Sequence, residues 1–200
     1  MRAPAVVPMA AIALVMLGVG HALAVVGNPV ALTEQAEAYE LKGQYSSAAA
    51  ARDRAVSYAK RTLESLKSSN SAAAKRDRAL AQSLIAENQR WAAEDRAGGG
   101  KLVHVKEEMQ FVAAKLQPVK ALESRYQQLK AKGANKDAES ARQQAVQQRK
   151  AFIATLNQKI SALDGMVNRK EKGWEARKIE ADYYRGVLAR WQWSLATLSA

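Results

Sequence analysis

Apolar residues recur every three or four positions through most of the second half of the chain, which is the spacing of one helix face. A first stripe begins at Leu102, and a second follows a turn at positions 132–135. The first stripe comprises Val105, Met109, Val112, Leu116, Val119, Leu122, Tyr126 and Leu129. The second comprises Ala138, Ala141, Ala145, Phe152, Leu156, Ile160 and Leu163. Two long stripes joined by a short turn predict an antiparallel coiled-coil hairpin.

The sequence also indicates where the helices of this hairpin bend and stop. Pro118 interrupts the hydrogen bonding of the first helix but not its stripe. We therefore expect one kinked helix there, or two helices nearly in line. In the turn, Gly133 is a suitable C-cap and Asn135 a suitable N-cap. We expect Gly165 to end the second helix.

The last helix, roughly from Trp174 to Leu198, is apolar on two opposite faces. One stripe comprises Trp174, Ala181, Tyr184, Leu188, Trp191, Leu195 and Leu198, and the other comprises Ile179, Tyr183, Gly186 and Trp193. A helix that is apolar on two faces packs between two partners. One face can pack on the hairpin, which leaves the other for the N-terminal helices, another protomer or a binding partner.

Helix-breaking and capping residues divide the first half into three shorter helices. We expect them from Thr33 to Lys42, from Ser46 or Ser47 to about Ser68, and from Ser69–Ser71 to the glycines at 98–100. No alternating run of strand length occurs, so an all-α chain is expected. Its two parts are N-terminal helical hairpins over residues 30–97 and, over residues 101–200, the basic coiled-coil hairpin with the amphipathic last helix.

The N-terminus has the features of an export signal. Arg2 is the last charged residue before Glu34, and an apolar stretch in this gap leads to a small-x-small motif that ends at Ala24. This pattern predicts a signal peptide over residues 1–24. An uncleaved anchor is the alternative, because the apolar stretch approaches the ~20 residues that cross a bilayer. In both cases we expect the rest of the chain to be exported, to the periplasm or the medium. The expected fold is an all-α, elongated helical bundle with the coiled-coil hairpin, preceded by the signal peptide.

Residues 32–60 carry a pattern of small and aromatic positions: Leu32, Ala36, Tyr39, Gly43, Tyr45, Ala48 and Ala55. This pattern resembles the helix-packing positions of a single tetratricopeptide repeat, although Arg52 stands where that family usually has an aromatic residue. The ~34-residue period brings no second copy, and stacking needs several repeats. The resemblance therefore implies a packed helical hairpin more than a peptide-binding groove.

Ser47–Ala55 and Ser71–Ala79 share an Arg-Asp-Arg sequence, which we expect to face solvent.

The composition offers little catalytic chemistry. The chain has no cysteine and two histidines, which removes thiol nucleophiles and imidazole-rich metal sites. His104 lies near Glu107 and Glu108, but we expect an exposed histidine rather than a metal ligand. No nucleotide-binding or nucleophile motif occurs. We predict no catalytic, cofactor-binding or metal-binding residues, and we do not expect an enzyme.

Positive charge is concentrated in the second half of the chain. The formal net charge is +12, and 19 Lys and Arg face 10 Asp and Glu after residue 100. In the last helix, basic residues are interleaved with aromatic ones. This mixture can bind polyanions, or the aromatic residues can form the core of a helical bundle. The candidate interaction residues are Arg177, Lys178, Ile179, Tyr183, Arg185, Trp191 and Trp193.

These features favour a non-enzymatic, exported adaptor or scaffold of the cell envelope that acts through protein–protein interaction. The expected partner is another protein or a second copy of the chain, bound through the last helix. One alternative is a periplasmic holdase-type chaperone, which the small, basic, helical character resembles. Another is a protein that binds an anionic envelope polymer or a lipid surface. No cofactor and no cytoplasmic nucleic acid are expected.

Overall fold

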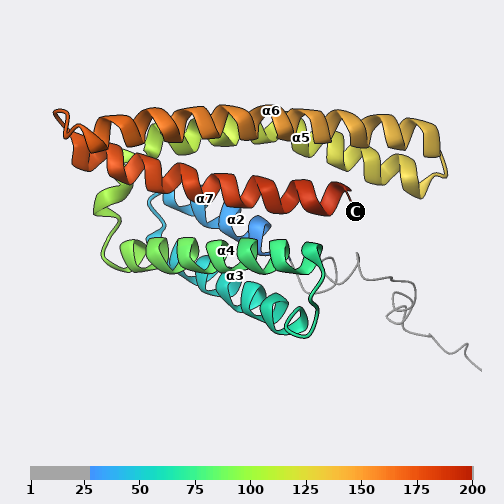
Figure 1. The fold of residues 1–200 in the computed structure, drawn as a ribbon, viewed down its shortest axis with the longest axis horizontal. Helices are drawn as coiled ribbons and strands as arrows, with labels where there is room; N and C mark the ends of the chain where they lie inside the picture. The colour runs from blue at the N-terminus through green and yellow to red at the C-terminus, as the bar shows by residue number, and fades with distance from the viewer. Residues whose placement is uncertain (1–27, 200) are drawn as a thin grey trace, which may run out of the picture.

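The computed structural model describes residues 28–199, and this part of the chain is all-helical, as predicted (Figure 1). It forms six α-helices and one short 3₁₀ helix. They are α2 (Pro29–Glu40), α3 (Tyr45–Ser65), α4 (Ala72–Arg96), η2 (Gly100–His104), α5 (Lys106–Ala131), α6 (Asn135–Asn168) and α7 (Trp174–Ser199). No helix within residues 28–199 combines the length and the hydrophobicity of a transmembrane segment. The predicted signal peptide lies outside the described residues.

The helices form two groups joined by α7. Helices α5 and α6 run antiparallel along the length of the molecule, and α7 packs along α6 (Figure 1). On its other side α7 packs on α4, which in turn packs on α3, while α2 lies against α3. The last helix is thus the layer between the long hairpin and the three N-terminal helices.

The ends of the N-terminal helices follow local capping, although not always at the predicted residue. The side chain of Asn28 accepts hydrogen bonds from the backbone N–H groups of Val30 and Ala31, at 3.1 and 3.2 Å, and so caps α2. Thr33 is therefore not the cap: it lies one turn inside α2, where its hydroxyl donates to the Pro29 carbonyl. Ser71 caps α4 by accepting from Ala74 N–H at 3.1 Å, as expected for a helix that restarts there.

The hairpin has the predicted antiparallel arrangement of two helices, with one different boundary. α5 runs through Pro118 as one helix, and the proline lies on its exposed side. Gly133, at φ 73°, makes the turn to α6. The expected stop at Gly165 is wrong: this glycine keeps helical geometry and α6 continues to Asn168. The left-handed backbone that follows α6 occurs at Lys170, at φ 50°.

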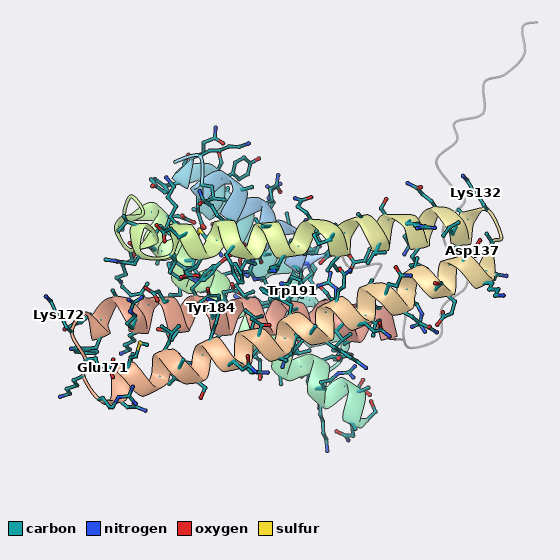
Figure 2. All side chains as sticks on the ribbon, turned by 90° about the horizontal axis from the view of Figure 1, so that it is seen from above. Lys132, Asp137, Glu171, Lys172, Tyr184 and Trp191 are labelled. Carbon is teal, nitrogen blue, oxygen red and sulfur yellow. The ribbon has the colours of Figure 1, made fainter. Side chains whose placement is uncertain are left out.

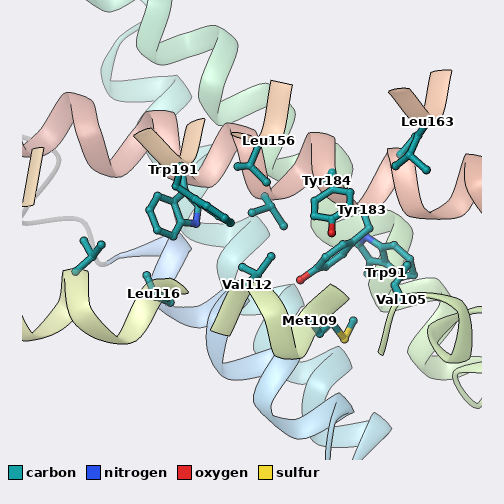
Figure 3. Close-up of a cluster of buried hydrophobic side chains, with 14 of the residues drawn as sticks. Trp91, Val105, Met109, Val112, Leu116, Leu156, Leu163, Tyr183, Tyr184 and Trp191 are labelled. Carbon is teal, nitrogen blue, oxygen red and sulfur yellow. The ribbon is translucent and has the colours of Figure 1, made fainter. Parts of the chain in front are cut away.

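Most of the apolar core lies where α7 meets the hairpin and α4 (Figure 3). The core contains most of the stripe positions of α5 and α6 together with both tyrosines of α7 and Trp91 of α4. A smaller cluster joins α2 to α3 through Ala36, Ala48 and Ala51, with Tyr39 packed against it. These two helices form a close hairpin, and its membership of the tetratricopeptide family stays a prediction.

Candidate functional site

The two apolar faces of α7 are both covered by the same chain. On one face, the Trp191 ring packs 4.4 Å from that of Phe152 on α6, measured between centroids. On the opposite face, Tyr183 meets Trp91 of α4 edge-on, at 6.2 Å. Trp193 closes a cluster with Val30, Leu80 and Leu84. Of the three occupants considered for the second stripe, the N-terminal helices are the one found.

This packing corrects the expectation that the aromatic residues of α7 form an interaction surface. Tyr183, Trp191 and Trp193 are only 1%, 3% and 5% exposed. A partner could contact them only after the fold had opened. Ile179 is half-buried at the edge of the contact between α4 and α7. Four aromatic residues of the last helix, Tyr183, Tyr184, Trp191 and Trp193, are core residues, which was the alternative interpretation of the same pattern.

The three predicted basic residues of α7 remain exposed, but two of them have acidic partners. Arg177 pairs with Glu180 at 2.9 Å. Arg185 pairs with Asp164 of α6 at 2.5 Å and with Asp182 at 2.9 Å. These pairs neutralise part of the charge that a polyanion would contact.

Lys178 and Ile179 lie together in a cleft of about 530 Å³ between α4 and α7. The ring of Trp91 lines this cleft as well, and its rim carries two ion pairs. Arg90 pairs with Asp182 at 3.1 Å, and Lys101 pairs with Glu94 at 3.5 Å. The structure thus brings two of the seven predicted residues into one cleft, with charge of both signs around it.

The far end of the α5–α6 hairpin projects beyond the rest of the described molecule (Figures 1 and 2). We call residues 125–142 the hairpin tip. α7 ends beside it, where Arg142 donates a hydrogen bond to the Leu198 carbonyl at 2.7 Å. The tip bears four exposed basic side chains, Arg125, Lys130, Lys132 and Lys136, and two exposed glutamines, Gln127 and Gln128. Gln143, just beyond the tip, is also exposed and donates a hydrogen bond to Glu139.

Acidic groups compensate little of this charge. Arg142 pairs with Glu139 at 2.8 Å, and its hydrogen bonds hold the pKa of that carboxyl at about 2. Asp137 is the remaining acidic residue of the tip. The tip is therefore a positively charged, hydrogen-bonding surface that is accessible from several sides.

A second unusual feature is a group of charged side chains buried where α2, α3, α4 and α7 meet. We call it the charge junction. It contains the carboxyl groups of Glu37, Glu40, Glu87 and Asp95 and the guanidinium groups of Arg52 and Arg190, all of which are buried. Charges are rarely buried in proteins unless they are paired, because each must be removed from water.

Each arginine of the charge junction bridges two carboxyl groups. Arg52 of α3 lies 2.5 Å from Glu40 of α2, and its Nε lies 3.4 Å from Asp95 of α4. Arg190 of α7 lies 2.6 Å from Glu37 of α2, and its Nε lies 3.3 Å from Glu87 of α4. Arg190 thereby connects α7 to two of the N-terminal helices.

Burial raises the pKa values of three acidic groups in the junction. It raises the pKa of Glu40 to about 8 against the opposing charge of Arg52. Burial also raises the pKa of Glu87, against Arg190, and that of Asp95, against Arg52. Glu40 Oε2 and both carboxyl oxygens of Glu87 and of Asp95 have no hydrogen-bond partner among the described residues. The junction therefore favours neutral carboxyl groups.

The sequence interpretation missed the charge junction. Arg52, expected on a solvent-facing Arg-Asp-Arg segment, is 0% exposed, whereas Asp53 and Arg54 do face solvent. A signal was present, because Arg52 falls four residues after Ala48 and three before Ala55, on the buried stripe of α3. Charged residues on an apolar stripe, with opposite charges on the stripes of other helices, indicate a buried ionic network.

A helical glycine of α7 makes room for one of these carboxyl groups. A Cβ atom at Gly186 would overlap the side chain of Glu87, which is buried and has little space to move. We expect Gly186→Ala to lower the free energy of unfolding by about 1–3 kcal/mol through overpacking.

Gly165→Ala is the matched control, since its Cβ would meet only the end of the Arg169 side chain. It should raise stability by about 0.5–1 kcal/mol through helix propensity. Urea unfolding followed by circular dichroism measures both, and equal effects would contradict the overlap.

The described residues contain no group of three His, Cys, Asp or Glu side chains arranged to hold a metal ion. His104 is exposed in η2, while Glu108 accepts a hydrogen bond from the Tyr184 hydroxyl.

No protein-family model, curated protein or solved structure matches the chain. The functional conclusion therefore rests on the geometry of the hairpin tip, the cleft between α4 and α7, and the charge junction.

Proposed function

We propose that the protein is an exported, non-enzymatic adaptor or scaffold of the cell envelope, and that its α5–α6 coiled-coil hairpin binds a partner protein. The observation that carries this proposal is the projecting hairpin tip, whose basic and amide side chains are exposed. A long antiparallel helix pair holds such a surface at a distance from the core, where a second molecule can contact it.

The chemistry of the exposed surface favours a polar, reversible interface. Within the described residues, Val103 is the one large hydrophobic side chain that is highly exposed, at 70%. Chaperones that hold unfolded clients and obligate dimers both need extended apolar surface. Polar interfaces are typical of partners that associate and separate, and complementary charge speeds their encounter. An adaptor therefore fits this surface better than a holdase does.

Export is the second part of the proposal and rests on the sequence of residues 1–24. Cleavage after Ala24 would leave the described fold complete, because α2 begins at Pro29 and its cap is Asn28. The partner would then belong to the periplasm or the outer surface, where an acidic protein surface could meet the hairpin tip.

Site-specific photo-cross-linking in cells tests the proposal. A photoreactive residue at Gln128 or Lys136 places the probe on the tip, and the same residue at Lys75, exposed on α4, is the matched control. We expect one discrete protein adduct from the tip positions and none from Lys75. Lys132→Glu combined with Arg125→Glu should reduce the adduct at least several-fold, because it reverses the charge of the tip.

A second comparison separates the two parts of the proposal. A chain that lacks residues 2–24 should remain inside the cell and give no adduct from the tip. Adducts that persist in this chain would contradict export, whereas absence of any tip-specific adduct from the full chain would contradict the adaptor role. Equal adducts from Lys75 and the tip would also count against a binding surface on the hairpin.

A further inference from the structure

The charge junction is unbalanced if all of its groups are ionised. Four carboxylates would face two guanidinium groups, which leaves two uncompensated negative charges in the core. A buried carboxyl group without a partner cation costs less free energy when it is protonated. The five carboxyl oxygens without hydrogen-bond partners show where the compensation by arginine is incomplete. They belong to Glu40, Glu87 and Asp95.

We propose that the charge junction is a proton-binding joint, which carries about two protons in the folded protein at neutral pH and weakens the packing of α2, α3, α4 and α7 against one another when it loses them. One proton belongs to the pair Glu40 and Asp95, which share Arg52. The other belongs to Glu87, which lies next to Arg190. This inference is independent of the adaptor function, since it concerns only the folded chain.

The surroundings of each pair are charged on every side. Glu40 of α2 is faced by Arg52 of α3, Asp95 of α4 and Glu37 of its own helix. A separate pocket lies next to Glu40. Lys106 of α5 lines it, as do Lys42, which follows α2, and Tyr45 of α3.

Glu87 of α4 is faced by Arg190 of α7, Arg52 of α3 and Glu37 of α2, with Arg90 on its own helix. The Tyr183 hydroxyl of α7 is buried and has no hydrogen-bond partner within residues 28–199, and burial raises its pKa well above the usual range. It therefore stays neutral and adds no charge. Among the described residues, Arg52 and Arg190 are the buried cations that pair with these carboxyl groups, whereas the buried Arg149 pairs with Glu123 of α5.

The direction of the pH dependence follows from the raised pKa values. An unfolded glutamate has its ordinary pKa of 4.5, and Glu40 in the fold has a pKa of about 8. Between these values the folded protein keeps a proton that the unfolded chain has lost. The stabilisation is complete below pH 4.5 and is lost as the pH rises to about 8. For each retained proton, the unfolding equilibrium constant rises about tenfold per pH unit in this range.

Proton release on unfolding is the direct test. The purified full chain is unfolded in urea at pH 7 in weakly buffered solution, and the protons released are counted by titration. We expect about two protons per chain, because the carboxyl groups regain their ordinary acidity when they reach water. Release of no protons would overturn the proposal, and this measurement needs no variant.

Urea unfolding of variants between pH 6 and pH 9 assigns the protons. Glu40→Gln places a neutral group where the protonated carboxyl lies, so the variant should fold. It should lack the contribution of one proton, so its unfolding equilibrium constant should rise with pH about tenfold less steeply per pH unit than that of the original protein. Glu139→Gln is the matched control: it is on the surface of α6, and its pKa of about 2 keeps it ionised throughout. It should leave the pH dependence unchanged. A Glu40→Gln variant with the full pH dependence of the original protein would overturn the assignment to this pair.

Discussion

Replacing Trp191 by alanine should lower the free energy of unfolding by about 3–5 kcal/mol, the usual cost of deleting a buried tryptophan side chain. The ring is 3% exposed and packs against Phe152 of α6. The guanidinium group of Arg149 lies over it, 4.9 Å from its centroid, and Arg149 in turn pairs with Glu123 of α5 at 2.5 Å. Trp191 therefore fixes α7 to both helices of the hairpin.

Trp174→Ala is the control for this variant. Trp174 begins the same helix but is only half-buried, so its removal should cost about 1 kcal/mol or less. Urea unfolding followed by far-ultraviolet circular dichroism measures both variants. If Trp191→Ala unfolded at the same urea concentration as the original protein, the residue would not belong to the core, and its assignment as an interaction residue would be restored.

Replacing Arg52 by methionine should destabilise the protein by about 3–5 kcal/mol at pH 8, because it removes one partner of a buried ionic network. Methionine keeps much of the volume of the side chain, so lost packing contributes little. Glu40 and Asp95 would then be buried without their common cation. At pH 5 the loss should be smaller, since both carboxyl groups can be protonated at moderate cost.

Two further variants separate charge from packing at this position. Arg54→Met changes an exposed arginine two residues along the same helix and should alter stability by less than about 0.5 kcal/mol. The double variant Arg52→Met and Glu40→Gln should recover part of the loss at pH 8, since it removes one of the two unpaired carboxylates. Arg52→Met with the stability of the original protein at both pH values would show that the buried pairs contribute nothing.

The helical class and most helix positions could be predicted because their signals are local. Helix ends depend on the backbone conformation of a few neighbouring residues, as at the glycines 98–100, at Ser71 and in the turn at Gly133. The stripes on α5, α6 and α7 identified most of the buried positions, including the labelled core residues of these helices in Figure 3, although they missed the buried Val187. The misplaced cap at Thr33 and stop at Gly165 are boundary errors, because Asn28 also has a capping side chain and because a glycine can keep helical geometry.

The candidate sites were less predictable. Basic residues could be counted in the sequence, but the net charge that each presents to a partner depends on its distance from acidic side chains. Arg185 is compensated by Asp164, which lies on another helix. The tip residues stand out only because α5 and α6 extend beyond the end of α7 (Figure 1).

The sequence by itself determined the helices, their apolar faces and the excess of positive charge, since each follows from residue type and short-range spacing. Only the tertiary structure decided which surface covers the second face of α7 and which charges leave water. Glu37 and Arg190 are 153 positions apart, and their pairing exists only because α2 and α7 are packed together. A periodic stripe shows that a residue is buried, but not against what. The free energy of a buried charge depends on that neighbour, so the charge junction is a property of the fold.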